Sequence, residues 1–199
     1  EQGQKVSAEE IVKKCLSYKP YIKKGGITLS GGEPLMQIPF VTEIFMRCKE
    51  KGIHTCLDTS GAMFEENEEM DQLIQYLDLV LLDIKQIDEE KHKILTGQGN
   101  NKIFHCAKYL EKRRVPVWIR HVVVPGLTDD EDSLTQVGRF IAGLNNVKAI
   151  DVLPYHDLGK RKYEELGIPY LLMDTLPLSE EKAIWAKKVI EKAFLDYRS

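Results

Sequence analysis

The sequence predicts an α/β fold built around a parallel sheet. Segments with helical and strand patterns alternate along the chain, the strand segments are apolar on both faces, and each of them ends in polar residues. Strands buried on both faces are typical of parallel sheets that are covered by helices and joined by right-handed crossovers. Both a doubly wound sheet and a partial (β/α) barrel satisfy this pattern.

Six segments have the signals of helices. The first begins at a capping box formed by Ser7 and Glu10, and the second ends before Gly52, a residue suited to the position after a helix. A second capping box, formed by Thr128 and Glu131, opens the fifth helix. The predicted helices span residues 7–24, 39–51, 66–77, 103–113, 128–144 and, after a cap at Ser179, 180–197.

Five segments between the helices have the composition of buried strands. Residues 79–82 read Leu-Val-Leu-Leu, so both faces of this strand are apolar. The alternation begins with a helix, whereas a complete βα repeat begins with a strand. The predicted strands span residues 27–30, 53–58, 79–84, 115–124 and 148–153.

The composition indicates one globular, cytoplasmic domain over residues 1–199. Hydrophobic residues make up 43% of the chain, which is enough for a single core. The net charge of −3 gives no electrostatic footprint for nucleic acid, and no apolar segment approaches the length of a membrane span. The four cysteines are 33, 8 and 50 residues apart, which fits neither a disulfide framework nor a zinc or iron–sulfur motif.

Polar residues gather where each predicted strand ends, which is where parallel α/β folds bind ligands. With a period of two, Asp83 and Lys85 share one face of their strand, and Arg120 and His156 would project into the same interior. A charge placed there is costly unless it is paired or bound to a ligand. The residues at the five strand ends are Ser30-Gly31-Gly32-Glu33, Asp58-Thr59-Ser60, Asp83-Ile84-Lys85, Arg120-His121 and Tyr155-His156.

Each of these features alone has a simpler explanation. The chain contains neither G-x-G-x-x-G nor a P-loop pattern, so no nucleotide-binding motif accounts for the glycines. The other histidines, including His121, are expected to have structural or surface positions. The simpler explanations are a turn at Gly31-Gly32, a helix cap at Asp58-Thr59, salt bridges of Asp83 with Lys85 or of Arg120 with Asp58 or Asp83, and a surface position for His156.

Residues 28–34 (TLSGGEP) resemble the GGE motif of the radical S-adenosylmethionine (SAM) superfamily. Longer runs are similar to one family within it, the activating enzymes of glycyl-radical enzymes, and above all to those that act on pyruvate formate-lyase. The runs keep the family's order and extend over nearly the whole chain. They are residues 54–61 (HTCLDTSG), 78–85 (DLVLLDIK), 118–126 (WIRHVVVPG) and 153–160 (LPYHDLGK).

The resemblance implies a partial (β/α) barrel of the radical SAM type, with five parallel strands present of an expected six. It implies SAM and a 4Fe-4S cluster as cofactors. One electron from the cluster splits SAM, and the 5′-deoxyadenosyl radical takes a hydrogen atom from a glycine. The implied partners are the glycine loop of pyruvate formate-lyase and, as electron donor, flavodoxin or ferredoxin, with no role for nucleic acid or a membrane.

The resemblance also implies residues that bind SAM. Gly31, Gly32 and Glu33 would hold the amino group of its methionine part. Lys85 would pair with the methionine carboxylate, and His156 would lie by the adenosine.

Further residues are implied beside these. Asp83 and Ile84 would contact the ribose, and Arg120 would add charge near the sulfonium or the substrate loop. No side chain need act as a general base, because the radical abstracts the hydrogen. The implied ligands of a monovalent cation are Asp58, Thr59 and the backbone of Leu81.

One feature departs from the family, because C-x-x-x-C-x-x-C, which binds the cluster through three thiolates, does not occur in the chain. In the family this motif follows the first strand, upstream of a helix like the one expected from Ser7. We therefore expect an N-terminally truncated domain that is inactive alone and binds SAM weakly at best, with residues 27–30 as an exposed sheet edge. The alternatives are an activating enzyme for another glycyl-radical enzyme and a non-catalytic binding scaffold.

Overall fold

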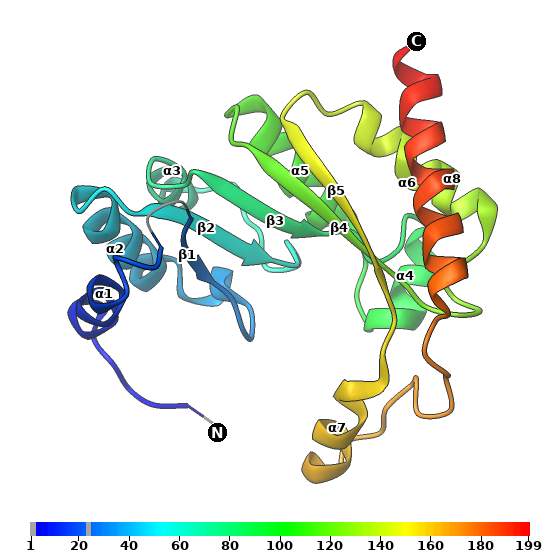
Figure 1. Cartoon of the computed structure of the whole chain (residues 1–199), viewed down its shortest axis with the longest axis horizontal. Coiled ribbons are helices and arrows are strands. Elements are labelled where there is room, and N and C mark those ends of the chain that lie inside the picture. Colours follow the sequence, from blue (N-terminus) through cyan, green and yellow to red (C-terminus); the bar gives the residue numbers. More distant parts are fainter. Residues whose placement is uncertain (1–2, 23–24) are drawn as a thin grey trace.

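The computed structural model describes residues 3–22 and 25–199 and contains one sheet of five parallel strands, in the order β1-β2-β3-β4-β5 (Figure 1). Each strand pairs with the next one along the chain. A doubly wound sheet reverses its strand order at a switch point, so this order matches an open part of a barrel wall instead. The strands are β1 (Gly26–Leu29), β2 (His54–Thr59), β3 (Leu79–Asp83), β4 (Val117–Val123) and β5 (Val147–Pro154).

The sheet curves as an open arc, and helices follow its outer side (Figure 1). The short helix α7 stands apart, beyond the end of β5. The long C-terminal helix α8 packs against α6 and β5. The helices are α1 (Ala8–Ser17), α2 (Ile38–Glu50), α3 (Glu68–Ile74), α4 (Glu89–Thr96), α5 (Asn101–Lys112), α6 (Glu131–Ala142), α7 (Lys160–Leu166) and α8 (Glu180–Arg198), with 3-10 turns η1 (Pro34–Gln37) and η2 (Asp157–Gly159).

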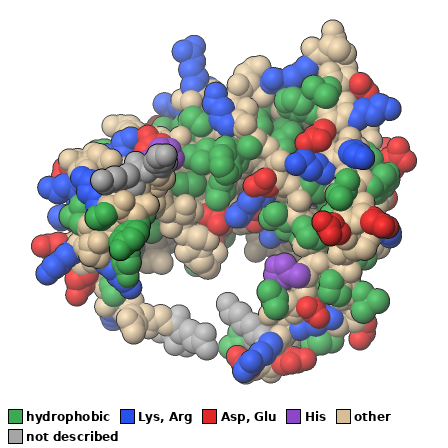
Figure 2. Space-filling view, viewed as in Figure 1, with side chains coloured by type: hydrophobic (Ala, Val, Ile, Leu, Met, Phe, Trp, Pro, Cys, Tyr) green, Lys and Arg blue, Asp and Glu red, His purple; other side chains and the backbone are tan. Residues whose placement is uncertain are grey.

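The two faces of the sheet differ in burial. Val80, Leu82 and Ile119 are 0% exposed and belong to the main core under the helices. On β4, Trp118 and Arg120 alternate with Ile119 and so project to the opposite face of the sheet, where Trp118 is 40% exposed. We call this second face the inner face. Figure 2 shows the molecule hollowed beyond the carboxyl ends of the strands, between its N-terminal part and the α7 region.

All five expected strands are present, with ends within two residues of the expected positions. β1 lies at one edge of the sheet and pairs, among the described residues, with β2 alone, as expected for residues 27–30. Among the described residues, no helix combines the length and apolar character that crossing a membrane requires.

The first helix begins as expected and ends early. The Ser7 hydroxyl accepts the Glu10 backbone N–H at 3.2 Å, and the Glu10 carboxylate accepts the Ser7 backbone N–H at 2.8 Å, which confirms the capping box. α1 ends at Ser17 and is followed by turns. The last expected positions, 23–24, lie outside the described residues.

The capping box expected at Thr128 and Glu131 is wrong. α6 is capped by Asp130, whose carboxylate accepts the Ser133 backbone N–H at 2.9 Å. Thr128 is 0% exposed, and its hydroxyl bonds the backbone near the end of β4. A buried hydroxyl with backbone partners nearby is more stable there than as a cap.

Two helices were not expected from the sequence. In α4 the buried residue is His92, and none of the described side chains of α7 is buried. Helices that bury so little carry no apolar stripe with helical spacing, which was the signal used for the others. The Asp88 cap of α4 was the available clue, because its carboxylate accepts the Lys91 backbone N–H at 2.8 Å.

Candidate functional site

The candidate site lies at the carboxyl ends of β2 and β3 and at the neighbouring Arg120, in the middle of β4. In the sheet register Asp58 is opposite Leu81, and Asp83 is opposite Arg120. Neighbouring residues in a ladder project to the same side, and side chains two positions apart share a face. The register therefore brings two carboxylates and one guanidinium together on the inner face.

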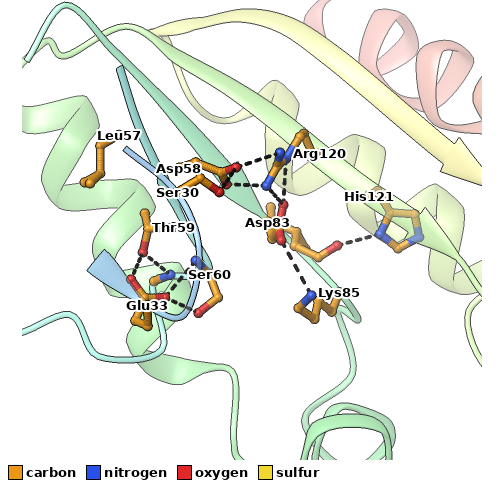
Figure 3. Close-up of polar contacts among 12 residues, drawn as sticks. Ser30, Glu33, Leu57, Asp58, Thr59, Ser60, Asp83, Lys85, Arg120 and His121 are labelled. Atoms are coloured by element: carbon orange, nitrogen blue, oxygen red, sulfur yellow. Dashed lines mark hydrogen bonds and ion pairs between the residues drawn. The ribbon is translucent and has the colours of Figure 1, made fainter. Parts of the chain in front are cut away.

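Arg120 bridges the two carboxylates (Figure 3). Its Nε and Nη2 lie 2.8 Å from Asp83 Oδ1, its Nη1 lies 3.1 Å from Asp58 Oδ2, and Nη2 also bonds Asp58 Oδ1. The Ser30 hydroxyl donates to Asp58 Oδ2 at 2.8 Å. The three charged side chains are 16–22% exposed. Burial lowers the pKa of Arg120, but the two carboxylates outweigh it and the net shift is upward.

Lys85 continues the same face beyond the end of β3. Its Nζ lies 3.5 Å from Asp83 Oδ2, and its side chain is 38% exposed. An ammonium has three donors, so this long contact leaves donors for a ligand. Lys85 lines a cavity of about 190 Å³ together with Ser60, Ala62, His92, Thr96, Gln98 and Ile103.

The loop after β1 requires glycine at two positions. Gly31 has φ 90° and Gly32 has φ 58°, a region that residues with a Cβ rarely adopt. A Cβ built on either residue would meet no described atom within 4 Å. The loop is therefore open on the side where a side chain would be, and a ligand can approach its peptide groups.

The Glu33 carboxylate ties this loop to the end of β2 (Figure 3). It accepts the Thr59 hydroxyl at 2.6 Å, and the Ser60 hydroxyl and backbone N–H at 2.6 and 3.0 Å. It also accepts the Leu35 backbone N–H at 3.1 Å, as the cap of η1. The structure thus gives the Glu33 side chain protein partners, and Ser60 connects the glycine loop to the cavity at Lys85.

The three residues expected around a monovalent cation lie side by side, since Asp58 and Leu81 are register partners and Thr59 follows Asp58. The Thr59 hydroxyl donates to Glu33 and accepts the Gly61 backbone N–H at 2.9 Å. The carboxylate oxygens of Asp58 likewise have partners. The donor set is hard oxygen, as an alkali cation prefers, but a cation would share those oxygens with the existing hydrogen bonds.

Two of the residues expected to bind SAM, Ile84 and His156, do not add side chains to this group of charged residues. Ile84 is 1% exposed and takes part through its backbone, whose N–H donates to the Arg120 carbonyl at 2.9 Å. His156 is exposed and follows β5, at the start of η2. The structure therefore joins Ile84 to the cluster of charged residues and places His156 two residues past the end of the last strand.

Some residues of the site were not assigned a role from the sequence. Ser30 and Ser60 belong to the polar strand ends, but their hydrogen bonds to Asp58 and Glu33 depend on neighbouring strands. His121 was expected to be structural, and it is 1% exposed with Nδ1 2.7 Å from the Ile84 carbonyl. The signal available for His121 was a polar residue at a buried position of β4.

The four cysteines are free and lie on four different elements, α1, α2, β2 and α5. Burial raises the pKa of Cys48 to about 11 and that of Cys106 to about 12, and it raises the pKa of Cys15 and Cys56 as well. Thiols with raised pKa values are poor metal ligands at neutral pH. Within residues 3–22 and 25–199, no group of three or more His, Cys, Asp or Glu side chains is placed to hold a metal ion.

Comparison with known proteins gives this arrangement a family. A model described as the radical SAM superfamily matches residues 1–136, more than half of the chain. The chain belongs to the radical SAM superfamily. The open glycine loop after β1 is the GGE motif on which the resemblance was based, and the sheet has the radical SAM form, a partial barrel with five parallel strands present.

Curated radical SAM relatives identify the nearer family. A pyruvate formate-lyase-activating enzyme of Staphylococcus epidermidis is 46% identical over 187 residues, which cover 91% of this chain and 74% of the relative. The one from Staphylococcus aureus is 47% identical over 180 residues, covering 87% and 72%. The resemblance seen in the sequence is thereby confirmed.

A solved structure agrees with these relatives. A domain of the pyruvate formate-lyase-activating enzyme from Bacteroides vulgatus superimposes with a TM-score of 0.70 at 26% identity, covering 85% of this chain and 94% of that domain. The match extends over most of both chains, so the two share the partial-barrel fold.

Proposed function

We propose that this chain is the SAM-binding part of an activating enzyme that generates a glycyl radical on pyruvate formate-lyase. One observation carries the proposal: Glu33 ties the open Gly31-Gly32 loop to Ser60, and Ser60 and Lys85 line one cavity. The methionine part of SAM carries an ammonium and a carboxylate. A loop of accessible peptide carbonyls, together with the Lys85 ammonium and its unused donors, complements that pair of charges.

The residues take the following parts. The peptide groups of Gly31 and Gly32 accept the methionine ammonium, and Lys85 donates to the carboxylate. Glu33 acts by holding the glycine loop in place, since its carboxylate is engaged by protein donors.

The other assignments extend along the inner face. Asp83 and Ile84 lie toward the ribose, and His156 lies toward the adenosine. Arg120 pairs with both Asp58 and Asp83 and adds positive charge near the sulfonium. A monovalent cation at Asp58, Thr59 and Leu81 would further balance the carboxylates.

The 4Fe-4S cluster and SAM together supply, when bound, the one-electron chemistry that abstracts a hydrogen atom from glycine. The chain's own residues bind and orient SAM and exclude water from the inner face. The protein substrate is the glycine loop of pyruvate formate-lyase, and flavodoxin or ferredoxin is the electron donor. The support for pyruvate formate-lyase as the substrate comes from relatives that are 46–47% identical to this chain and are named for it.

Calorimetry tests the SAM site. SAM is titrated into the purified chain and into its Lys85→Ala variant, with Lys102→Ala as a control, because Lys102 is an exposed lysine paired with Glu65 on the surface. The proposal expects SAM to bind the parent chain and the control with equal affinity, and Lys85→Ala about tenfold more weakly. Equal affinity for all three chains, or no binding to the parent, contradicts it.

Electron paramagnetic resonance tests the partner. The protein used carries this chain together with a C-x-x-x-C-x-x-C cluster segment. It is reduced and then mixed with SAM and pyruvate formate-lyase under anaerobic conditions. The expected result is the doublet of a glycyl radical. A doublet only with a dehydratase, a choline lyase or the anaerobic ribonucleotide reductase would assign the chain to another activating enzyme.

A further inference from the structure

The segment that carries Lys85 is held in place by buried polar side chains. It runs from Ile84 to Asp88, between the end of β3 and the start of α4. The side chains that bind its backbone are His121, Gln86 and Asn100, which are 1–2% exposed. We call these three residues the clamp.

His121 holds the first residue of the segment. Its Nδ1 lies 2.7 Å from the Ile84 carbonyl, and the Ile84 N–H donates to the carbonyl of Arg120 at 2.9 Å. The backbone ladder between β3 and β4 ends at the Asp83–Arg120 pair. The imidazole thus supplies one more hydrogen bond just where the chain leaves the sheet.

The hydrogen bond to Ile84 also indicates which nitrogen of the imidazole carries the proton. A carbonyl oxygen only accepts, so Nδ1 carries the proton and donates. Nε2 is buried and has no hydrogen-bond partner among the described residues, which suits an unprotonated nitrogen. His121 is therefore a neutral donor on the covered face of β4, while Arg120 beside it projects onto the inner face and pairs with Asp83.

Gln86 and Asn100 hold the other side of Lys85. The Asn100 amide donates to the carbonyls of Gln86 and Ile87 at 3.1 and 2.8 Å. The Gln86 side chain accepts the backbone N–H groups of Ile87 and Asp88 at 2.7 and 3.2 Å, and donates to the Leu127 carbonyl at 2.9 Å. Backbone groups on both sides of Lys85 are thus bonded to buried side chains.

We infer that the clamp positions Lys85 for a ligand carboxylate, with His121 as a positioning residue that acts through the Ile84 backbone. This rests on the proposed function, in which the carboxylate belongs to SAM. The Lys85 side chain is long and partly exposed, so a mobile backbone beneath it would lower its affinity for a single charged group. Holding the backbone in advance lowers the ordering cost of binding.

Three variants test the inference. His121→Leu removes the donor and keeps an apolar side chain of similar size, while His121→Asn keeps an amide N–H near the position of Nδ1. Asn146→Leu is the matched control, because Asn146 is also buried, at 7% exposure, and donates to a backbone carbonyl, that of Val115 at 2.7 Å. Asn146 lies before β5, at the opposite end of the sheet from Lys85.

Two measurements are made on the whole chain, hydrogen–deuterium exchange of the peptide covering residues 84–88 and calorimetric titration with SAM. Thermal unfolding of each variant shows that it is folded. We expect His121→Leu to exchange faster in this peptide and to bind SAM about five- to tenfold more weakly. His121→Asn should restore most of the slow exchange and most of the SAM affinity. Asn146→Leu should change the stability of the fold but neither the exchange of this peptide nor the SAM affinity.

The outcomes separate the inference from the proposed function. A parent chain that does not bind SAM contradicts the proposed function and, with it, the role given to Lys85. A parent chain that binds SAM, together with unchanged exchange or unchanged affinity in His121→Leu, overturns the clamp alone. A loss in Asn146→Leu equal to that in His121→Leu also overturns it, because the effect would then be one of general stability.

Discussion

At the scale of single residues, the charges on the inner face are held by their mutual arrangement. Asp58 and Asp83 come from neighbouring strands and share one guanidinium, at side-chain exposures of 16% and 18%. Partly buried carboxylates are costly without a partner. The pairing alone therefore explains why these residues are compatible with the fold.

Removing the guanidinium should destabilise the fold. We expect Arg120→Ala to lower the free energy of unfolding by about 2 kcal/mol, because two carboxylates are left facing each other in a partly buried place. Arg47→Ala is the control, since the Arg47–Glu43 pair is helical with side chains 41% and 44% exposed. That exposed pair should contribute less than about 0.5 kcal/mol. Urea unfolding measures both, and equal losses would show that the Arg120 pairs add nothing.

Burial of His121 should make stability depend on pH. Burial lowers the pKa of His121 below its ordinary value of 6.5, although its hydrogen bond to the Ile84 backbone opposes the shift. The unfolded chain therefore takes up a proton near pH 6.5 that the folded chain does not, so stability is lost as the pH falls below that value. Urea unfolding from pH 7 to about pH 5 should show a steeper loss in the parent chain than in His121→Leu. Parallel curves would contradict a buried neutral imidazole.

At the scale of elements, helix packing depends on one small residue. A Cβ at Gly138 of α6 would lie 2.5 Å from the Ile190 carbonyl oxygen and 2.8 Å from the Ala193 Cβ of α8. Contacts this short with backbone cannot be relieved by rotating a side chain. The close approach of α6 and α8, which covers the outer side of the sheet at β5, therefore requires glycine at this position.

A substitution there should separate the two helices. We expect Gly138→Ala to destabilise the chain by about 2 kcal/mol, because the strain of overpacking exceeds the gain in helix propensity. Gly143→Ala is the control, because Gly143 ends α6 with φ −73° and its Cβ would meet its nearest atom at 3.4 Å. The control should stay within about 0.5 kcal/mol of the parent. Thermal or urea unfolding decides, and a neutral Gly138→Ala would show that the helices can move apart freely.

At the scale of the whole molecule, the four cysteines lie on four different elements. Burial raises the pKa values of their thiols. The chain therefore keeps its thiols on separate elements, and no three of them form a C-x-x-x-C-x-x-C motif.

Anaerobic reconstitution tests that separation. We expect the 199-residue chain, incubated with iron, sulfide and reductant, to show no EPR signal of a 4Fe-4S cluster, since it contains no C-x-x-x-C-x-x-C. A protein that joins such a segment to this chain is the positive control and should show the signal. A reconstituted cluster in the 199-residue chain would mean that its scattered thiols can be brought together.

Several features follow from short-range patterns in the sequence. The strand positions, the caps at Ser7 and Ser179 and the placement of polar residues at strand ends were all predicted, because periodicity and capping act within a few residues. The helices α4 and α7 were missed because they bury little apolar surface. The mistaken cap at Thr128 arose because the same residue pattern serves a buried turn and a helix start.

The sequence by itself determined the α/β class, the alternation of elements and the end of the sheet where the site lies. Periodicity left a doubly wound sheet and a partial barrel open, the resemblance implied the barrel, and the structure confirmed it. The tertiary structure alone decided which side chains meet at that end of the sheet. Arg120 contacts residues 37 and 62 positions away, and Glu33 contacts residues 26 and 27 positions away. Such pairs depend on the register between strands, and a one-residue slip would turn each side chain to the opposite face.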